Sequence, residues 1–138
     1  MKALVIGAGK MGYAAATDLA QAQEVEVVGV ADVDDSCLEA SEQKMERVLR
    51  DKDGKSFGEK LVFHCVDITD KTKSVELMNQ YDVGVITLPN RRCSYKAIEA
   101  AIEARLNVVD ILEEYHRRPD AEEIEGLVLP VDMSLDEY

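Results

Sequence analysis

The chain has 138 residues, the size of one ordinary domain, of which 46% are hydrophobic and 32% are charged. Its 28 acidic residues against 16 basic ones give a formal net charge of −12, which disfavours nucleic acids and anionic membranes as partners. No apolar run approaches the roughly 20 residues that span a bilayer. The three cysteines have no zinc-site spacing, so we expect half-buried, reduced thiols in a cytoplasmic protein.

Apolar runs and helical periods alternate along the first half of the chain. Residues 2–6 predict a short buried strand that ends at Gly7, and a helical period follows over residues 10–23. The face that this period predicts contains Met11, Ala14, Ala15, Leu19 and Ala20. Residues 25–31 are rich in valine and predict a second strand.

A second helix is expected from about residue 36 to residue 50. Either Asp34 or Asp35 can cap it, because a carboxylate accepts hydrogen bonds from the free N–H groups of a first turn. The side chains expected to point inward are Leu38, Met45, Val48 and Leu49. Residues 51–60 contain an Asp-Gly pair and a further glycine, which are turn signals.

The second half continues the alternation. Residues 61–66 predict a third strand, 73–79 a short helix, and 83–88 a fourth strand closed by Pro89. The next helix is indicated by apolar residues at helical spacing: Tyr95, Ile98, Ala101, Ile102 and Leu106. Residues 108–112 predict a fifth strand. Strict alternation of this kind predicts an α/β fold with a parallel sheet and helices on both faces.

The loop Gly7-Ala8-Gly9-Lys10-Met11-Gly12 matches the GxGxxG fingerprint of dinucleotide-binding domains. It follows a strand and opens a helix, which is the context the motif requires. Gly7 permits the tight turn, Gly9 lets the backbone approach a pyrophosphate, and Gly12 lets the helix pack closely on the strand. The helix start then presents N–H groups to the phosphates, flanked by Lys10 and Met11.

Asp32 ends the second strand, 20 positions after Gly12. An acid at this place accepts hydrogen bonds from the adenosine ribose, and its charge repels the extra phosphate of NADP. No arginine follows it, so NAD is favoured over NADP as the cofactor. The alternative is that Asp32 only caps the next helix. Together, loop and acid predict a Rossmann-type doubly wound sheet of strand order 3-2-1-4-5 over residues 1–112.

Further candidates lie where the later strands end, because ligands bind at the carboxyl edge of such sheets. Val33 follows Asp32, and Asp67 and Ile68 follow the third strand, where they can flank the adenine. Asp67 is equally plausible as a cap for the next helix. Leu88 and Pro89 end the fourth strand, although Pro89 can simply terminate it.

The residues show no nucleophile–base–acid set and no metal cluster, so we assign no catalytic residue and no metal ligand. His64 lies among apolar residues of the third strand and is expected to be structural, whereas His116 is expected to be exposed. Cys93 is expected to be an ordinary cysteine at a helix start. Asp110 points toward the cofactor edge in this topology.

Residues 1 to about 112 resemble the N-terminal NAD(P)-binding domain of the saccharopine dehydrogenase family, including its lysine 6-dehydrogenase-like members. The matching segments are KALVI before the GAGKMG loop, VADVD around Asp32, Val66-Asp67, ITLP, the helix AIEAAIEA and the strand NVVD that follows it. In the glucose-fructose oxidoreductase-like family, a similar helix leads to Glu-Lys-Pro with a catalytic lysine. Here that place reads Asp110-Ile111-Leu112, which counts against that family.

The resemblance implies an oxidoreductase that transfers hydride between a nicotinamide and a carbon bearing an amine, with a small amino acid as substrate. The family's catalytic part lies downstream of its Rossmann half. We therefore expect the acidic residues 113–138 to begin a linker, and the chain alone to show no turnover with lysine or saccharopine. A homodimer is one possible state. The alternative is a stand-alone nucleotide-sensing module like the regulatory domains of potassium-uptake systems, which are of similar length.

Overall fold

The computed structural model describes residues 1–49 and 57–111, and the expected linker at 113–138 lies outside these residues. The strands are β1 (Lys2–Ile6), β2 (Val27–Asp32), β3 (Leu61–Cys65), β4 (Val83–Ile86) and β5 (Asn107–Asp110). The helices are α1 (Lys10–Gln21), α2 (Asp35–Val48), α3 (Lys71–Met78) and α4 (Arg91–Ala104), and a 3₁₀ helix, η1 (Phe57–Lys60), precedes β3. The alternation predicted from the sequence is confirmed.

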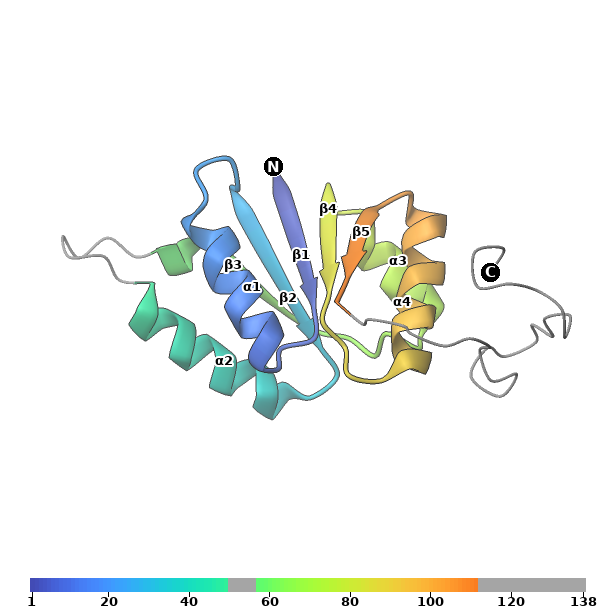
Figure 1. Ribbon diagram of the computed structural model, residues 1–138, viewed down its shortest axis with the longest axis horizontal. Coiled ribbons are helices and arrows are strands. Elements are labelled where there is room, and N and C mark those ends of the chain that lie inside the picture. Colours follow the sequence, from blue (N-terminus) through green and yellow to red (C-terminus); the bar gives the residue numbers. More distant parts are fainter. Residues whose placement is uncertain (50–56, 112–138) are drawn as a thin grey trace, which may run out of the picture.

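The five strands form one parallel sheet of order β3-β2-β1-β4-β5, as predicted. All the strands point the same way, so their carboxyl ends share one edge of the sheet (Figure 1). The chain adds β2 and β3 on one side of β1, and then β4 and β5 on the other, so the order of the strands reverses between β1 and β4. That is the switch point at which folds of this class bind ligands.

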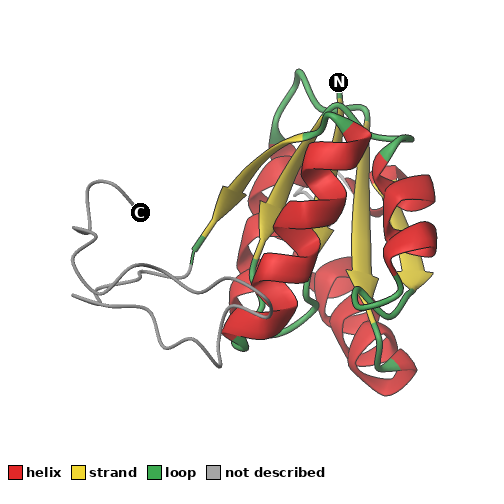
Figure 2. Ribbon diagram, turned by 90° about the vertical axis from the view of Figure 1, so that its right-hand side faces the viewer, coloured by secondary structure: helices red, strands yellow, loops and turns green. Residues whose placement is uncertain are grey.

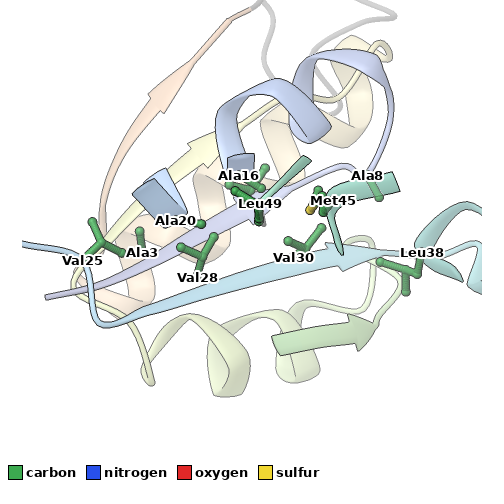
Figure 3. Close-up of a cluster of buried hydrophobic side chains, with 11 residues drawn as sticks. Ala3, Ala8, Ala16, Ala20, Val25, Val28, Val30, Leu38, Met45 and Leu49 are labelled. Atoms are coloured by element: carbon green, nitrogen blue, oxygen red, sulfur yellow. The ribbon is translucent and has the colours of Figure 1, made fainter. Parts of the chain in front are cut away.

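Two apolar cores lie on opposite faces of the sheet because successive side chains of a strand alternate in direction. Ala3 and Val5 of β1 belong to the core under α1 and α2, drawn in Figure 3. Leu4 and Ile6 belong to the core under α3 and α4. Helices therefore cover both faces, as Figures 1 and 2 show, and the doubly wound architecture is confirmed.

The buried face of α1 agrees with the predicted one only in part: Ala20 is buried, and Ala15 and Leu19 pack against the core. Gly12, Ala16 and Ala20 are buried, whereas Met11 is 59% exposed and Ala14 is also exposed. Small residues at this spacing let the helix approach the sheet closely, which a face containing Met11 would prevent. Hydrophobicity ranked Met11 as a core residue, but close helix–sheet packing required the smaller side chains.

Two more apolar side chains that were expected inside lie outside. Val48 of α2 is 54% exposed and Ile102 of α4 is 73% exposed. In α4 the buried positions are again small: Ser94, Ala97, Ala100 and Ala101. The strand expected at 25–31 starts two residues later, because the N–H of Val25 bonds to the Ala22 carbonyl in a turn.

Tyr81 supports the edge strand β3 on the face that α3 and α4 cover. Its hydroxyl lies 2.6 Å from His64 Nε2, and the two rings meet edge to face with centroids 5.9 Å apart. The tyrosine ring lies against Gly29 of β2, where a Cβ would overlap it. His64 is thus partly buried and held by a hydrogen bond, in agreement with its expected structural role.

We predict that His64 makes the stability of the protein depend on pH. Burial lowers its pKa below the ordinary value of about 6.5, so the folded state disfavours the proton that the unfolded chain binds. The stability that the neutral His64 ring contributes is fully present above pH 6.5. It is lost as the pH falls from there through the lower pKa that His64 has in the folded state. Because the ring is partly exposed, the loss should stay below about 1 kcal/mol.

The measurement is the free energy of unfolding by urea between pH 7.5 and 5.0, for the wild type and for His64→Gln. The glutamine can still reach the Tyr81 hydroxyl but does not titrate in this range. The difference between the two proteins should change with pH in the direction stated. Parallel curves would show that His64 does not couple folding to protons.

Candidate functional site

The amino-terminal turn of α1 lacks the side-chain cap that the other α-helices in residues 1–49 and 57–111 possess. The caps are Asp34 for α2, Asp70 for α3 and Asn90 for α4. The residue before α1 is Gly9, which has no side chain to accept a bond, and the first turn of α1 carries no acidic residue. The positive end of α1 is therefore left available to an anion at the switch point.

Gly7 and Gly12 are required by the protein itself. Gly7 has a positive φ of 104°, and its N–H donates to the Ala31 carbonyl at 2.7 Å. A Cβ on Gly12 would overlap the carbonyl oxygen of Gly7, and Thr87 Oγ1 would lie only 2.9 Å from it. The helix thus begins in direct contact with the turn that precedes it, as the motif predicts.

Gly9 is different, because nothing in the fold requires a glycine there. Its backbone is extended, with φ −66°, and apart from its two neighbours in the chain no residue has an atom within 4 Å of the position that a Cβ would occupy. The residue is exposed at the carboxyl edge of the sheet. The open space beside Gly9 is what a ligand that touches the backbone at this point would need.

Asp32 joins the end of β2 to the glycine loop. One carboxylate oxygen accepts the N–H of Ala8 at 2.7 Å, and the other accepts the N–H of Asp34 at 3.1 Å. The cap of α2 is Asp34, whose oxygen accepts the N–H groups of Ser36 and Cys37. Asp32 is thus not the helix cap that was weighed as its alternative role, and it remains partly exposed.

The surroundings of Asp32 are strongly acidic. Hydrogen bonds from the Ser36 hydroxyl and from the backbone N–H groups of Ser36 and Cys37 lower the pKa of Asp34. Burial raises the pKa of the Cys37 thiol, and the charges of Asp32 and Asp34 raise it further. The two carboxylates thus make the surroundings of the Cys37 thiol anionic and disfavour its thiolate form.

Cys65 is paired with Asp32 in the parallel register and is exposed, which corrects the expectation of a half-buried thiol. Its sulfur donates to the Val33 carbonyl, with 3.6 Å between the two atoms. A hydrogen bond to Asp35 is the largest cause that raises the pKa of this thiol. Cys37 and Cys93 are half-buried, as expected.

The other predicted site residues lie at the same edge with different exposures. Lys10, Met11, Val33 and Pro89 are exposed, and Leu88 is partly exposed next to Gly7. Ile68 is buried in the core, where its carbonyl accepts the Ser74 hydroxyl at 3.1 Å.

Asp67 does not cap α3. It accepts the N–H and the hydroxyl of Thr69, and the hydroxyl bond is the larger cause that lowers its pKa. Asp70 provides the cap instead, by accepting the N–H of Lys73. The cap role weighed for Asp67 is thus wrong, and its carboxylate stays exposed at the carboxyl edge.

Two hydroxyl groups that hold the loop were not found from the sequence. Thr87 Oγ1 lies 3.0 Å from the Ile6 carbonyl and 2.9 Å from that of Gly7, and Ser41 Oγ donates to the Ala8 carbonyl at 2.7 Å. One signal was present in the sequence. Ser41 occupies the inward stripe of α2 between Leu38 and Met45, where an apolar residue would be expected.

Within the described part of the chain, no group of three or more His, Cys, Asp or Glu side chains could hold a metal ion. No helix among the same residues is long and apolar enough to cross a membrane. The site thus consists of an uncapped helix start, an exposed glycine backbone and a carboxylate at the end of the neighbouring strand.

Solved structures with a similar fold include several enzymes. Saccharopine dehydrogenase (L-Glu forming) from Saccharomyces cerevisiae matches with a TM-score of 0.61 and 19% identity, over 83% of this chain and 22% of that one. AtPrR2 with NADP⁺ and (+)-pinoresinol matches with a TM-score of 0.52 and 20% identity, over 77% and 34%. The Escherichia coli tRNA N6-threonylcarbamoyladenosine dehydratase matches with a TM-score of 0.58 and 14% identity, over 79% of this chain and 50% of that one. At these identities the likeness establishes the fold.

The family is established by the sequence of the chain. The family model described as "Saccharopine dehydrogenase NADP binding domain" matches residues 3–126, which is most of the chain. The match includes the glycine loop, Asp32 and, except for Lys2, all five described strands. The chain spans about a fifth of the yeast enzyme to which it is similar. The chain therefore belongs to the saccharopine dehydrogenase family and comprises its NAD(P)-binding Rossmann domain.

Proposed function

We propose that the chain binds NAD at the carboxyl edge of its sheet and serves as the cofactor-binding domain of an amine oxidoreductase. The observation that carries this proposal is the open space beside Gly9 at an uncapped helix start. A protein that needed only to fold would have no use for a glycine there. A backbone that must touch a pyrophosphate would need it.

The residues present fit a dinucleotide. The N–H groups at the start of α1 would face the pyrophosphate, beside Lys10 and Met11, and Asp32 would accept hydrogen bonds from the adenosine ribose. Val33 and Asp67 would border the adenine, while Leu88 and Pro89 would border the nicotinamide half. The side chain of Ile68, which was predicted beside the adenine, belongs to the core instead. The bound nicotinamide would accept or donate a hydride, and the protein's own part is to hold and orient it.

The preference for NAD over NADP is argued from charge. A 2′-phosphate on the ribose would lie beside Asp32, and the two neighbouring acids Asp34 and Asp35 add to its repulsion. The segment from Val33 to Ser36 supplies no arginine or lysine to accommodate that phosphate. The description of the family's domain names NADP. The proposed preference of this chain for NAD would therefore be a difference from that description, and it would arise at the adenosine ribose.

The chemistry proposed for the complete enzyme follows from family membership. The relative from yeast is a saccharopine dehydrogenase, and a substrate with an amine on the carbon that exchanges hydride is the corresponding class here. Membership of this family also favours the enzyme over the nucleotide-sensing module. A homodimer and the role of residues 113–138 as a linker remain predictions.

Titration calorimetry of the chain with NAD, NADP, ADP-ribose and ATP tests the proposal. NAD and ADP-ribose should bind, NADP should bind more weakly, and ATP should bind least. Absence of binding by every dinucleotide would refute the cofactor site. Tightest binding by ATP would favour the sensing module instead.

Gly9→Ala should weaken cofactor binding without destabilising the fold. We expect at least about tenfold weaker NAD binding, because the added methyl group would occupy the space through which the pyrophosphate reaches the backbone. The thermal midpoint should change little, since no protein atom lies near that methyl group. Calorimetry and a melting curve measure the two effects. Full NAD affinity in this variant would contradict contact between cofactor and backbone at Gly9.

A further inference from the structure

The first peptide of the glycine loop is held from both sides. Its carbonyl, from Gly7, lies 2.9 Å from the Thr87 hydroxyl, and its N–H, from Ala8, donates to Asp32 at 2.7 Å. Thr87 follows β4 and Asp32 ends β2, the two strands that flank β1. Both polar groups of this peptide are therefore engaged by the protein and its orientation is fixed.

The second peptide joins Ala8 to Gly9 and is held on one side. Its carbonyl accepts the buried hydroxyl of Ser41 at 2.7 Å, from a residue 33 positions away on α2. The carbonyl and the N–H of a trans peptide point in opposite directions, and the described residues contain no cis peptide. The N–H of Gly9 must therefore point away from Ser41. Among residues 1–49 and 57–111 it has no hydrogen-bond partner.

We propose that Ser41 is a positioning residue for the cofactor, which aims the Gly9 N–H at the pyrophosphate by holding the opposite end of the same peptide. This inference rests on the proposed function, because it assigns Ser41 a part in the same site. Ser41 does not touch the ligand. It acts through a backbone group that does.

The placement of Ser41 supports a specific task. The residue lies on the buried stripe of α2 with Leu38 and Met45, and only 7% of its surface is exposed. A hydroxyl in such a place needs a hydrogen-bond partner, and the one described for it is the Ala8 carbonyl. Without Ser41, that carbonyl would lose its buried donor, and the peptide could rotate so that the Gly9 N–H no longer faces outward.

The test compares the affinities of Ser41→Ala and of the wild type for NAD, ADP-ribose and adenosine. Calorimetry measures these affinities, and NMR titration is used for the weakest ligand. We expect about fivefold to tenfold weaker binding of NAD and ADP-ribose, the value of about one hydrogen bond. Adenosine has no pyrophosphate, so its affinity should stay within about twofold of the wild-type value. Ser41→Thr keeps the hydroxyl and should restore most of the affinity for ADP-ribose.

Ser94→Ala is the matched control, because Ser94 is also buried in a helix and its hydroxyl has no described partner. It should leave the affinity for all three ligands unchanged. Equal weakening of adenosine and ADP-ribose by Ser41→Ala would refute the positioning role, as would unchanged ADP-ribose affinity. If the wild type binds none of the three ligands, the proposed function itself fails, and the two failures are thereby distinguishable.

Discussion

Gly12→Ala should destabilise the protein by at least about 3 kcal/mol, the largest effect we expect from a single methyl group. The new Cβ would overlap the Gly7 carbonyl oxygen, which is backbone and cannot rotate away as a side chain would. Relief would require α1 to move off β1, and Ala16 and Ala20 would then lose their close packing on the sheet. Urea denaturation followed by circular dichroism measures the loss.

Gly9→Ala is the matched control for this stability measurement, since it adds the same methyl group three residues away. There the methyl group meets no protein atom within 4 Å, so the free energy of unfolding should change by less than about 0.5 kcal/mol. Equal stability of the two variants would show that the close contact between α1 and the Gly7 turn is not required for folding.

The sequence contained enough information to predict the sheet. Five apolar runs separated by helical periods, with a glycine turn after the first, determined the strand order that the structure has. The reason is physical, because parallel strands joined by helices pack with one handedness and the glycine fingerprint marks the first crossover. The predicted strands and helices were correct in type, and their ends differed by a few residues.

The buried faces of α1 and α4 were predicted less well, and the errors in these two helices share one cause. The periodicity singled out large apolar residues such as Met11 and Ile102, and both are exposed. These two helices instead bury alanine, serine and glycine. The size of the side chains that a helix can bury depends on the distance between the helix and the sheet, and a single sequence does not give that distance.

The site was only partly predictable for a related reason. Gly7, Gly9, Gly12 and Asp32 belong to a motif with fixed spacing, so the sequence places them together. Ser41 and Thr87 reach the loop from α2 and from the end of β4, 33 and 80 positions away from the carbonyls that they contact. Hydrogen bonds over such distances along the chain depend on how the layers assemble, and the polar residue in the buried stripe of α2 was their only trace.

Asp32→Ala should weaken NAD binding by about 1–3 kcal/mol, because the ribose would lose hydrogen bonds to a charged acceptor. The same change removes the partner of the Ala8 N–H, so part of the loss would come through the loop. Asp32→Asn tests the charge separately, since an amide oxygen can still accept that N–H. It should narrow the difference in affinity between NAD and NADP, because the repulsion of a 2′-phosphate falls with the charge.

Asp70→Ala is the control for this last prediction, since it removes a carboxylate of the same type that caps α3 and whose described contacts are with Lys73. It should cost stability through the lost cap and leave NAD affinity unchanged. Calorimetric titration of the three variants with both dinucleotides gives all the required affinities. Unchanged NAD binding by Asp32→Ala would remove the ribose role from this residue. An unchanged ratio of NAD to NADP affinity in Asp32→Asn would show that charge at this strand end does not set the cofactor preference.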